Sequence, residues 1–444
     1  MTRRKSRRTL SRRQATPHSP RSGPHPPPVA GDYNKTLIEY ALQSGRFKRE
    51  IEPAKRAFWG RSVPEIGSGG EMNAGMLFWA DWFTYKRPLR TGLTPLQTFI
   101  QEYREHLSAE DLAAYQKLTH SIVSVFEVLE VVRDRSVTVR DLQDGQVYTV
   151  IEKRATRQMA PGQLVSAHIL PLPNEYRFTG AAAPWPSPLK EHIADFLADL
   201  VASGQGPGTV ELVPTLERAR RSAYMEGTDL RRLERAIQLY HGGRTQWPEA
   251  RRLLQALLEA EPFNPAVNFY YGLVCDDRAE RERRLRLVQA ITPEFKDPWG
   301  QYLDFHLAST FEAQKKYDEA EAAYRRLLRQ DPDDSATYYN FGGMLERLGR
   351  WEEAEALYRQ TARRFRHDHQ CHASLGHLCL RQGRQDEARE QFSLALQKAR
   401  QQLADFPGCI DDEIMADLEA ALREAGGDPA TVPEPKSRRW RLWH

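Results

Sequence analysis

The feature of this 444-residue sequence that most constrains its fold is a repetition of side-chain size every 34 residues in the C-terminal half. Shifting this half by one period superimposes three columns of similar residues. Two columns contain small residues, and one contains aromatic residues. The small residues are Ala308, Gly342 and Gly376 in the first column and Ala320, Ala354 and Ala388 in the second, and the aromatic residues are Tyr324, Tyr358 and Phe392. Small residues let two helices cross closely, and large ones fill the space between neighbouring pairs. The period therefore predicts a stack of antiparallel helical pairs.

This period and its columns resemble the tetratricopeptide repeat (TPR) family, in which each repeat is a hairpin of two helices, A and B. Extending the register upstream places a further repeat at residues 231–264 and a degenerate one at 265–298, which keeps Gly272 but lacks the alanine column. We expect about five repeats over residues 231–402. Residues 403–425 are expected to form a capping helix over the last apolar face, and residues 426–444 a tail.

The resemblance implies that the A helices line an extended concave surface on which a partner binds. The outward A-helix positions are aromatic early in the array and basic late in it. They are Phe269, Tyr270, Tyr302, Phe305, Tyr339, Asn340, Arg347, His377 and Arg381. Because aromatic residues and arginine dominate many interfaces, we predict that this strip binds a protein or peptide with some acidic character. For any single aromatic residue, packing between repeats is an equal alternative.

The N-terminal half predicts a different fold. Upstream of Ser121 the pattern is helical, and downstream of it β-branched and aromatic residues dominate. Two predicted strands, Ser136–Val139 and Val147–Ile151, flank Asp144-Gly145, a pair that favours a type I′ hairpin turn because both central residues need positive φ. We expect residues 32–188 to form an α+β module with a small curled sheet or barrel of about five strands, and residues 189–230 to form linker helices. The whole chain is then mostly α.

Residues 70–180 resemble a module of bacterial proteins that carry a SEC-C zinc motif. The resemblance rests on stretches such as Phe78-Trp-Ala-Asp-Trp82 and Pro161-Gly-Gln-Leu164. The cysteine-rich SEC-C motif itself is missing from this sequence, so metal binding does not follow. The resemblance implies a bacterial, cytoplasmic module without an assigned reaction.

Residues 1–31 form a Pro-rich arm with eight Lys or Arg and no Asp or Glu. The net charge of the chain is +4, so the remainder carries −4. We expect a disordered arm that either attaches to nucleic acid or an acidic surface, or is a solvated tail. With basic residues of the predicted sheet, the arm supports an alternative function as an RNA- or ribosome-associated factor. Those residues are Arg140, Lys153, Arg154, Arg157 and Arg177, interleaved with acidic residues as on a solvated face.

Other functions have little support in the sequence. The longest apolar stretches fall short of the roughly 18 residues that span a membrane, and the mean hydropathy is −0.66. The four cysteines have no CxxC spacing, which fits a reducing cytoplasm. Histidines and cysteines gather between His367 and Cys379, where zinc is conceivable, but the register assigns His372 and Cys379 to packing positions. We therefore expect no metal.

No nucleotide-binding, serine-nucleophile or zinc-protease motif is found in the sequence. We expect no catalytic residues, no cofactor and no enzyme activity. A reaction hidden in the N-terminal module would need a deep polar pocket around Trp79, Trp82 and Tyr85. The sequence thus predicts a cytoplasmic adaptor that binds a protein or peptide.

Overall fold

The computed structural model describes residues 32–59, 74–206, 209–225, 228–296, 302–365, 368–406 and 410–435. The chain divides into two compact units, Met1–Arg220 and Arg221–His444, and each is described by itself. The predicted basic arm, His367, Cys409 and residues 436–444 of the predicted C-terminal tail lie outside the described residues.

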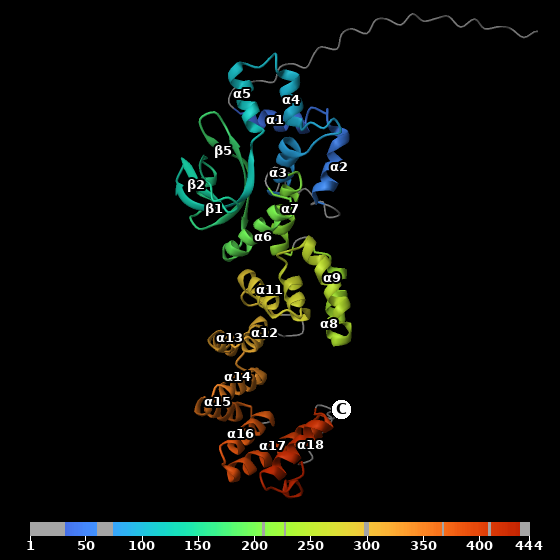
Figure 1. The fold of residues 1–444 in the computed structure, drawn as a ribbon, viewed down its shortest axis with the longest axis vertical. Coiled ribbons are helices and arrows are strands. Elements are labelled where there is room, and N and C mark those ends of the chain that lie inside the picture. The colour runs from blue at the N-terminus through green and yellow to red at the C-terminus, as the bar shows by residue number, and fades with distance from the viewer. Residues whose placement is uncertain are drawn as a thin grey trace, which may run out of the picture. The chain divides into compact units, whose positions relative to one another are not determined.

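Short helices precede the sheet in the N-terminal unit, as predicted (Figure 1). They are α1 (Tyr33–Leu42), α2 (Lys48–Trp59), α3 (Ala74–Asp81) with a π-helical turn (Trp82–Lys86), α4 (Pro95–Tyr103) and α5 (Ala109–Leu118). The start of α4 follows from its sequence. The Thr94 hydroxyl accepts a hydrogen bond from the Gln97 amide, the Gln97 side-chain oxygen accepts one from the Thr94 amide, and proline occupies the first helical turn. Ser108 caps α5, because its hydroxyl accepts a hydrogen bond from the Asp111 amide.

Five strands then close into a barrel in the order β1-β2-β3-β5-β4. The strands are β1 (Ile122–Val132), β2 (Ser136–Asp141), β3 (Val147–Ile151), β4 (Leu164–Pro171) and β5 (Tyr176–Trp185). Neighbours are antiparallel except β3 and β5, which meet in parallel where Val150 pairs with Tyr176. Alternate residues such as Phe126, Val139 and Ile169 fill the interior, so the predicted five-stranded curled sheet is confirmed.

The turn between β2 and β3 differs from the predicted type I′ hairpin. The amide of Asp141 donates to the carbonyl of Gln146, which leaves a four-residue loop instead of a two-residue turn. Gly145 has φ +76°, whereas the φ of Asp144 is not positive. The Asp144 side chain explains this geometry, because it accepts a hydrogen bond from the Gln146 amide, 2.9 Å away, and stabilises a wider turn.

After the barrel, α6 (Lys190–Ala202) and α7 (Leu212–Ala223) occupy the predicted linker region. A run of paired helices follows (Figure 1). The pairs are α8 (Leu230–His241) with α9 (Trp247–Ala260), α10 (Pro265–Val274) with α11 (Arg278–Ile291), α12 (Leu303–Ala313) with α13 (Tyr317–Gln330), α14 (Ser335–Arg347) with α15 (Trp351–Arg364), and α16 (Gln370–Arg381) with α17 (Gln385–Asp405). The predicted class, an α+β module followed by a helical array, is confirmed.

The side-chain columns pack as their sizes require. A Cβ added to Gly342 would lie 2.3 Å from the Tyr358 ring, and one added to Gly376 would lie 2.7 Å from the Phe392 ring. Ala320, Ala354 and Ala388 are fully buried. Helices α14 and α16 therefore approach α15 and α17 at distances that only glycine permits, with the aromatic ring of each B helix lying over the glycine of its A helix.

The degenerate pair, α10 with α11, is looser at the same point. A Cβ on Gly272 would meet its nearest neighbour, the Arg284 Cβ, at 3.4 Å, an ordinary contact. No aromatic ring occupies that place in α11. Helix α11 thus lacks the aromatic residue that the later B helices have, and α10 crosses α11 without the ring-on-glycine contact.

Helix α18 (Asp412–Glu424) lies in the region predicted to cap the array. Leu418 and Leu422 are buried in a cluster with Phe392 and Leu396 of α17. A short 3₁₀ turn (Pro429–Thr431) follows, where the Arg400 guanidinium donates to the carbonyls of Pro429 and Val432. Within the described part of the chain, no helix combines the length and apolarity that crossing a membrane requires.

Candidate partner-binding surface

The first two residues of the predicted surface strip are not on a surface. Phe269 and Tyr270 are both 0% exposed. The Phe269 ring packs 4.9 Å from Phe295, and the Tyr270 ring packs 5.6 Å from Tyr240. Helix α10 is buried on nearly all sides, so it has no outward face at these positions. The prediction that Phe269 and Tyr270 lie on the outward face of their helix is wrong, because the degenerate repeat gave no column to fix which side of the helix faces out.

Tyr302 and Phe305, at the start of α12, are half-buried. The Tyr302 hydroxyl donates to Asp331, 3.1 Å away, and the Lys296 ammonium lies 4.3 Å from the centre of its ring. The Phe305 ring makes an edge contact with His306, 5.5 Å between centres. Tyr302 is therefore engaged by its own repeat and by the segment that precedes it, and neither Tyr302 nor Phe305 lines the hollow described below.

The two predicted arginines are exposed but paired inside the molecule. The Arg381 guanidinium lies 2.7 Å from the carboxylate of Glu346, which also accepts the Tyr358 hydroxyl at 2.8 Å. The same triad recurs one repeat earlier, where Arg347 pairs with Glu312 and Tyr324 donates to Glu312. Each triad ties an A helix to its B partner and to the next A helix. Because these arginines are already neutralised, the expectation of an acidic partner loses its basis.

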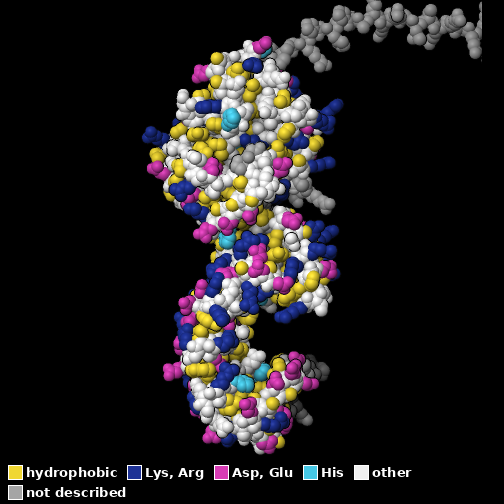
Figure 2. Space-filling model, viewed as in Figure 1, with side chains coloured by type: hydrophobic (Ala, Val, Ile, Leu, Met, Phe, Trp, Pro, Cys, Tyr) yellow, Lys and Arg dark blue, Asp and Glu magenta, His cyan; other side chains and the backbone are white. Residues whose placement is uncertain are grey.

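Tyr339 and His377, by contrast, line a common hollow of about 550 Å³. Its walls come from α14, α16 and α18, and Figure 2 shows this part of the chain hollowed, with histidine side chains in cyan inside it. The lining residues are Tyr339, His369, Gln370, Ala373, Ser374, His377, Ile414, Asp417, Leu418, Ala420, Ala421 and Glu424. Asn340 is exposed beside it and donates its side-chain amide to the carbonyl of Ala336, 2.8 Å away.

His369 lines the hollow, and one of its ring nitrogens has no partner among the described residues. Its side chain is buried, with Nδ1 2.7 Å from Oε1 of Gln402, while Nε2 is buried without a partner among the described residues. An amide oxygen only accepts, so Nδ1 carries a hydrogen, and a ring with no second hydrogen has a lone pair at Nε2. A buried acceptor left without a donor costs about 1–3 kcal/mol. A ligand that donates to Nε2 removes this cost.

Two carboxylates stand on the α18 side of the hollow. Asp417 and Glu424 are both exposed, and Ile414, Leu418 and Ala421 of the same helix supply apolar surface between and beside them. Sequence reasoning assigned this helix only a capping role and missed these residues. A signal was present, because positions seven apart lie on one face of a helix two turns from each other.

The predicted lining residues add no positive charge to the hollow. Burial, followed by the charge of Arg381, lowers the pKa of His377, so its ring is neutral at pH 7. Burial and the carboxylate of Asp368 raise the pKa of Tyr339, whose hydroxyl donates to that carboxylate. The hollow therefore presents acceptors, two negative charges and apolar surface.

Metal binding at the histidine and cysteine cluster is not indicated by the geometry. Across the residues that the structure describes, no group of three or more His, Cys, Asp or Glu side chains is placed to hold a metal ion. His372 Nδ1 lies 2.9 Å from the amide oxygen of Gln391, and Cys371 is buried, which raises the pKa of its thiol to about 11. These residues pack the last repeat.

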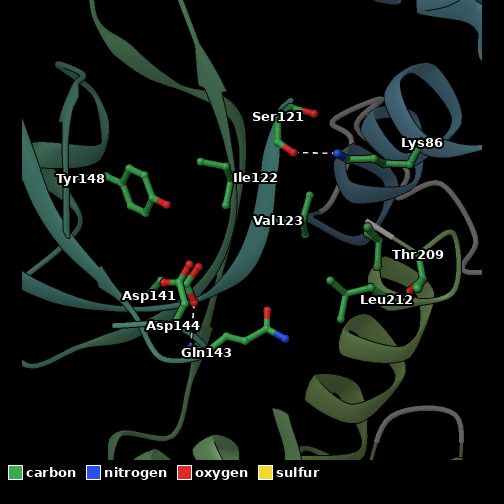
Figure 3. Close-up of a pocket in the computed structure, with 11 residues that line it drawn as sticks. Lys86, Ser121, Ile122, Val123, Asp141, Gln143, Asp144, Tyr148, Thr209 and Leu212 are labelled. Carbon is green, nitrogen blue, oxygen red and sulfur yellow. Dashed lines mark hydrogen bonds between the residues drawn. The ribbon is translucent and has the colours of Figure 1, made fainter. Parts of the chain in front are cut away.

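The N-terminal unit has a smaller cavity, of about 190 Å³ (Figure 3). It lies between the π-helical turn, the start of β1, the β2–β3 loop and α7. An enzyme in this unit would need a pocket around Trp79, Trp82 and Tyr85. None of these three residues lines the cavity. They are buried in the core, where Trp79 stacks on Trp59 and the Tyr85 hydroxyl donates to Asn34 at 2.7 Å.

The basic residues predicted around the barrel are partly compensated. Arg140 lies 3.5 Å from Glu127, Arg157 pairs with Asp134 at 2.7 Å, and Arg177 pairs with Glu175. Lys153 and Arg154 are exposed. The surface is thus closer to a solvated mixture of charges than to a continuous basic patch.

Comparison with known families supports the division into two parts. Residues 305–369 and 345–402 match the model of the tetratricopeptide repeat family. Residues 70–203 match a family of unknown function, DUF7986. The association of this region with SEC-C proteins stays a prediction. No curated protein matches the chain significantly.

Solved structures with similarity to this chain include those of MamA and YrrB. A crystal structure of MamA is 20% identical over 35% of this chain and 90% of its own, with a TM-score of 0.31. MamA from Desulfovibrio magneticus RS-1 is 16% identical over 40% of this chain and 98% of its own, with a TM-score of 0.35. YrrB, described as a TPR protein with an unusual peptide-binding site, is 14% identical over 38% and 84%, with a TM-score of 0.31.

Similarity at this level does not transfer a function from those proteins. The family models are more direct: residues 305–402 of this chain consist of tetratricopeptide repeats, a protein-protein interaction module, and residues 70–203 form a domain of a family whose function is unknown.

Proposed function

We propose that this protein is a non-enzymatic cytoplasmic adaptor that binds a peptide segment of a partner in the hollow between α14, α16 and α18. The observation that carries the proposal is the chemistry of that hollow. An unpartnered acceptor, His369 Nε2, and two carboxylates, Asp417 and Glu424, border apolar surface. Tetratricopeptide repeats in residues 305–402 support a protein as the ligand.

The same chemistry selects the kind of peptide. A ligand that satisfies His369 has to donate a hydrogen bond, and one placed between Asp417 and Glu424 gains from positive charge. Ile414, Leu418 and Ala421 favour an apolar side chain beside that charge. We therefore infer a peptide in which Lys or Arg is adjacent to one or more apolar residues, the reverse of the acidic partner that the arginines suggested.

Selection from a random peptide library on the full chain tests this proposal. Enriched peptides are expected to share a Lys or Arg next to apolar residues. Asp417→Asn combined with Glu424→Gln removes both negative charges from the hollow. This double variant is expected to weaken peptide binding about tenfold, which corresponds to about 1.4 kcal/mol. Glu413→Gln is the matched control, because Glu413 is exposed on the same helix but does not line the hollow.

Two outcomes would contradict the proposal. One is enrichment of acidic peptides, and the other is equal loss of binding in the control and the double variant. Melting curves of the double variant, the control and the unmodified protein separate a binding defect from unfolding. Asp417 and Glu424 are exposed, so their substitution is expected to change stability by no more than about 0.5 kcal/mol.

A second candidate function, RNA binding by the N-terminal half, is supported by the closed barrel and by exposed Lys153 and Arg154. It predicts RNA affinity that falls steeply with salt and loses much of that slope when residues 1–31 are deleted. A filter-binding series between about 50 and 200 mM salt measures the slope. RNA affinity that is absent, or independent of salt, would remove this candidate.

A further inference from the structure

The cavity of the N-terminal unit contains a lysine without a counter-ion. The Lys86 side chain reaches toward the start of β1, where its ammonium donates to the carbonyl of Ser121, 2.6 Å away (Figure 3). No carboxylate of the described residues lies within ion-pair distance of this ammonium, although it has three hydrogens to donate. Burial lowers the pKa of Lys86 to about 8, so the group is mostly charged at pH 7. A half-buried charge in this state is costly unless an anion joins it.

Two further polar groups at the cavity lack partners. The Ser121 side chain is 6% exposed and its hydroxyl makes no hydrogen bond in the described structure. The side-chain nitrogen of Gln143, from the β2–β3 loop, is buried and is also without a partner there. Both residues line the cavity with Lys86. Native proteins leave few such groups unsatisfied, so the cluster points to a missing ligand.

The opposite side of the cavity is acidic. Asp141 and Asp144 lie beside Gln143, and Figure 3 shows them across the cavity from Lys86, with the Tyr148 ring nearby. Asp141 already accepts from the Ser124 hydroxyl at 2.6 Å and from the Gln143 amide at 2.8 Å through the same oxygen. Its other oxygen accepts no hydrogen bond from the described residues and retains accepting capacity. Two carboxylates in the wall disfavour a ligand that is only anionic.

We propose that this cavity binds a small zwitterion, whose carboxylate contacts Lys86 and Ser121 and whose ammonium contacts Asp141 and Asp144. One water needs roughly 10–15 Å³ of such space. The cavity volume of about 190 Å³ is many times larger, so it has room for a ligand of amino-acid size. The apolar side chains of Ile122, Val123, Leu212 and Val213 also line the cavity. This site is separate from the peptide-binding hollow and does not depend on it.

Isothermal titration calorimetry on the full chain tests the proposal with defined probes. Glycine, β-alanine and 4-aminobutyrate are zwitterions of increasing length, and acetate and methylammonium carry one charge each. We expect at least one zwitterion to bind saturably at one site per chain. Acetate and methylammonium are expected to bind at least tenfold more weakly, because each leaves one end of the cavity uncompensated.

Variants assign the binding to this cavity. Lys86→Met is expected to weaken zwitterion binding at least tenfold, and Gln143→Leu offers a second change in the same wall. Lys117→Met is the matched control, because the Lys117 ammonium also donates to backbone carbonyls, those of Leu172 and Pro173, but lies outside the cavity. If Lys86 only held the π-helical turn to β1, its replacement would change the melting temperature and leave binding intact.

Three results would overturn the proposal. They are the failure of all three zwitterions to saturate the protein, acetate binding as tightly as the best zwitterion, and binding that Lys86→Met and Gln143→Leu leave unchanged. Melting curves of each variant, recorded with and without probe, establish that the protein compared is folded.

Discussion

At the scale of single residues, the C-terminal unit depends on side chains that are small enough. Gly342 and Gly376 each face the aromatic ring of the paired helix at a distance that excludes a methyl group. The need for a small side chain could be predicted from the sequence, because it recurs at a fixed period and concerns size alone. The burial of Phe269 and Tyr270 could not be predicted, since their repeat lacks the columns that fix its register.

Two adjacent glycines in α14 give a matched test of this packing. Gly342→Ala is expected to destabilise the protein by about 1–3 kcal/mol, because the new methyl group overlaps the Tyr358 ring. Gly343→Ala is expected to raise stability by up to about 1 kcal/mol, because only the Arg347 guanidinium lies near and alanine favours the helix. Urea unfolding measures both. Equal effects of the two substitutions would contradict the ring-on-glycine contact.

At the scale of elements, ion pairs between repeats recur with the same period as the packing columns. Lys316 pairs with Glu282 at 2.6 Å, Arg350 with Glu321 at 2.5 Å, and Arg384 with Glu355 at 3.1 Å. In each pair the basic residue precedes a B helix and the acid lies on the preceding B helix. The sequence indicated the helices but not these partners, because a pairing across repeats depends on how the hairpins stack.

These pairs predict a defined response to acid. Burial raises the pKa of Glu282, but hydrogen bonds from Lys316 and Arg286 outweigh it, and the net pKa is lowered. The pKa of Glu355 is lowered in the same way by Arg359 and Arg384. A carboxylate with a lowered pKa in the folded state stabilises the fold above its unfolded pKa, roughly 4.3, and this contribution is lost as pH falls through the folded value.

Glu282→Gln is therefore expected to lower the free energy of unfolding at pH 7 and to flatten its decline between pH 5 and about 3. Glu352→Gln, at an exposed position in the first turn of α15, is the control and is expected to leave the profile almost unchanged. Thermal melts across this pH range record the effect. A Glu282→Gln profile parallel to that of the unmodified protein would show that the pair contributes nothing.

The N-terminal elements show where local patterns stop being sufficient. Capping residues at Thr94 and Ser108 and the change of pattern at Ser121 were enough to locate helices and strands. A curled sheet or barrel was predicted, but without a strand order, so the parallel β3–β5 contact that closes the barrel was not predicted. The loop at Asp144 was mispredicted because a side-chain hydrogen bond favours a wider turn.

At the scale of the whole molecule, the chain joins a module of a family without known function to an array of interaction repeats. The sequence predicted this organisation and a binding surface on the A helices. Only Tyr339 and His377 of the predicted strip line the hollow, and its acidic wall comes from α18. How a terminal helix folds against the array is a tertiary property that periodicity does not encode.

Site-specific photo-crosslinking tests most directly the claim that a partner binds in this hollow. A benzophenone side chain is placed in the full chain at Ala420, exposed on the wall of the hollow, or at Ala356, exposed on α15 and outside it. After irradiation in nuclease-treated cell extract, the account predicts that Ala420 alone gives one dominant polypeptide adduct, attached beside a Lys or Arg with apolar neighbours. No adduct at Ala420, or the same adducts at both positions, would contradict it.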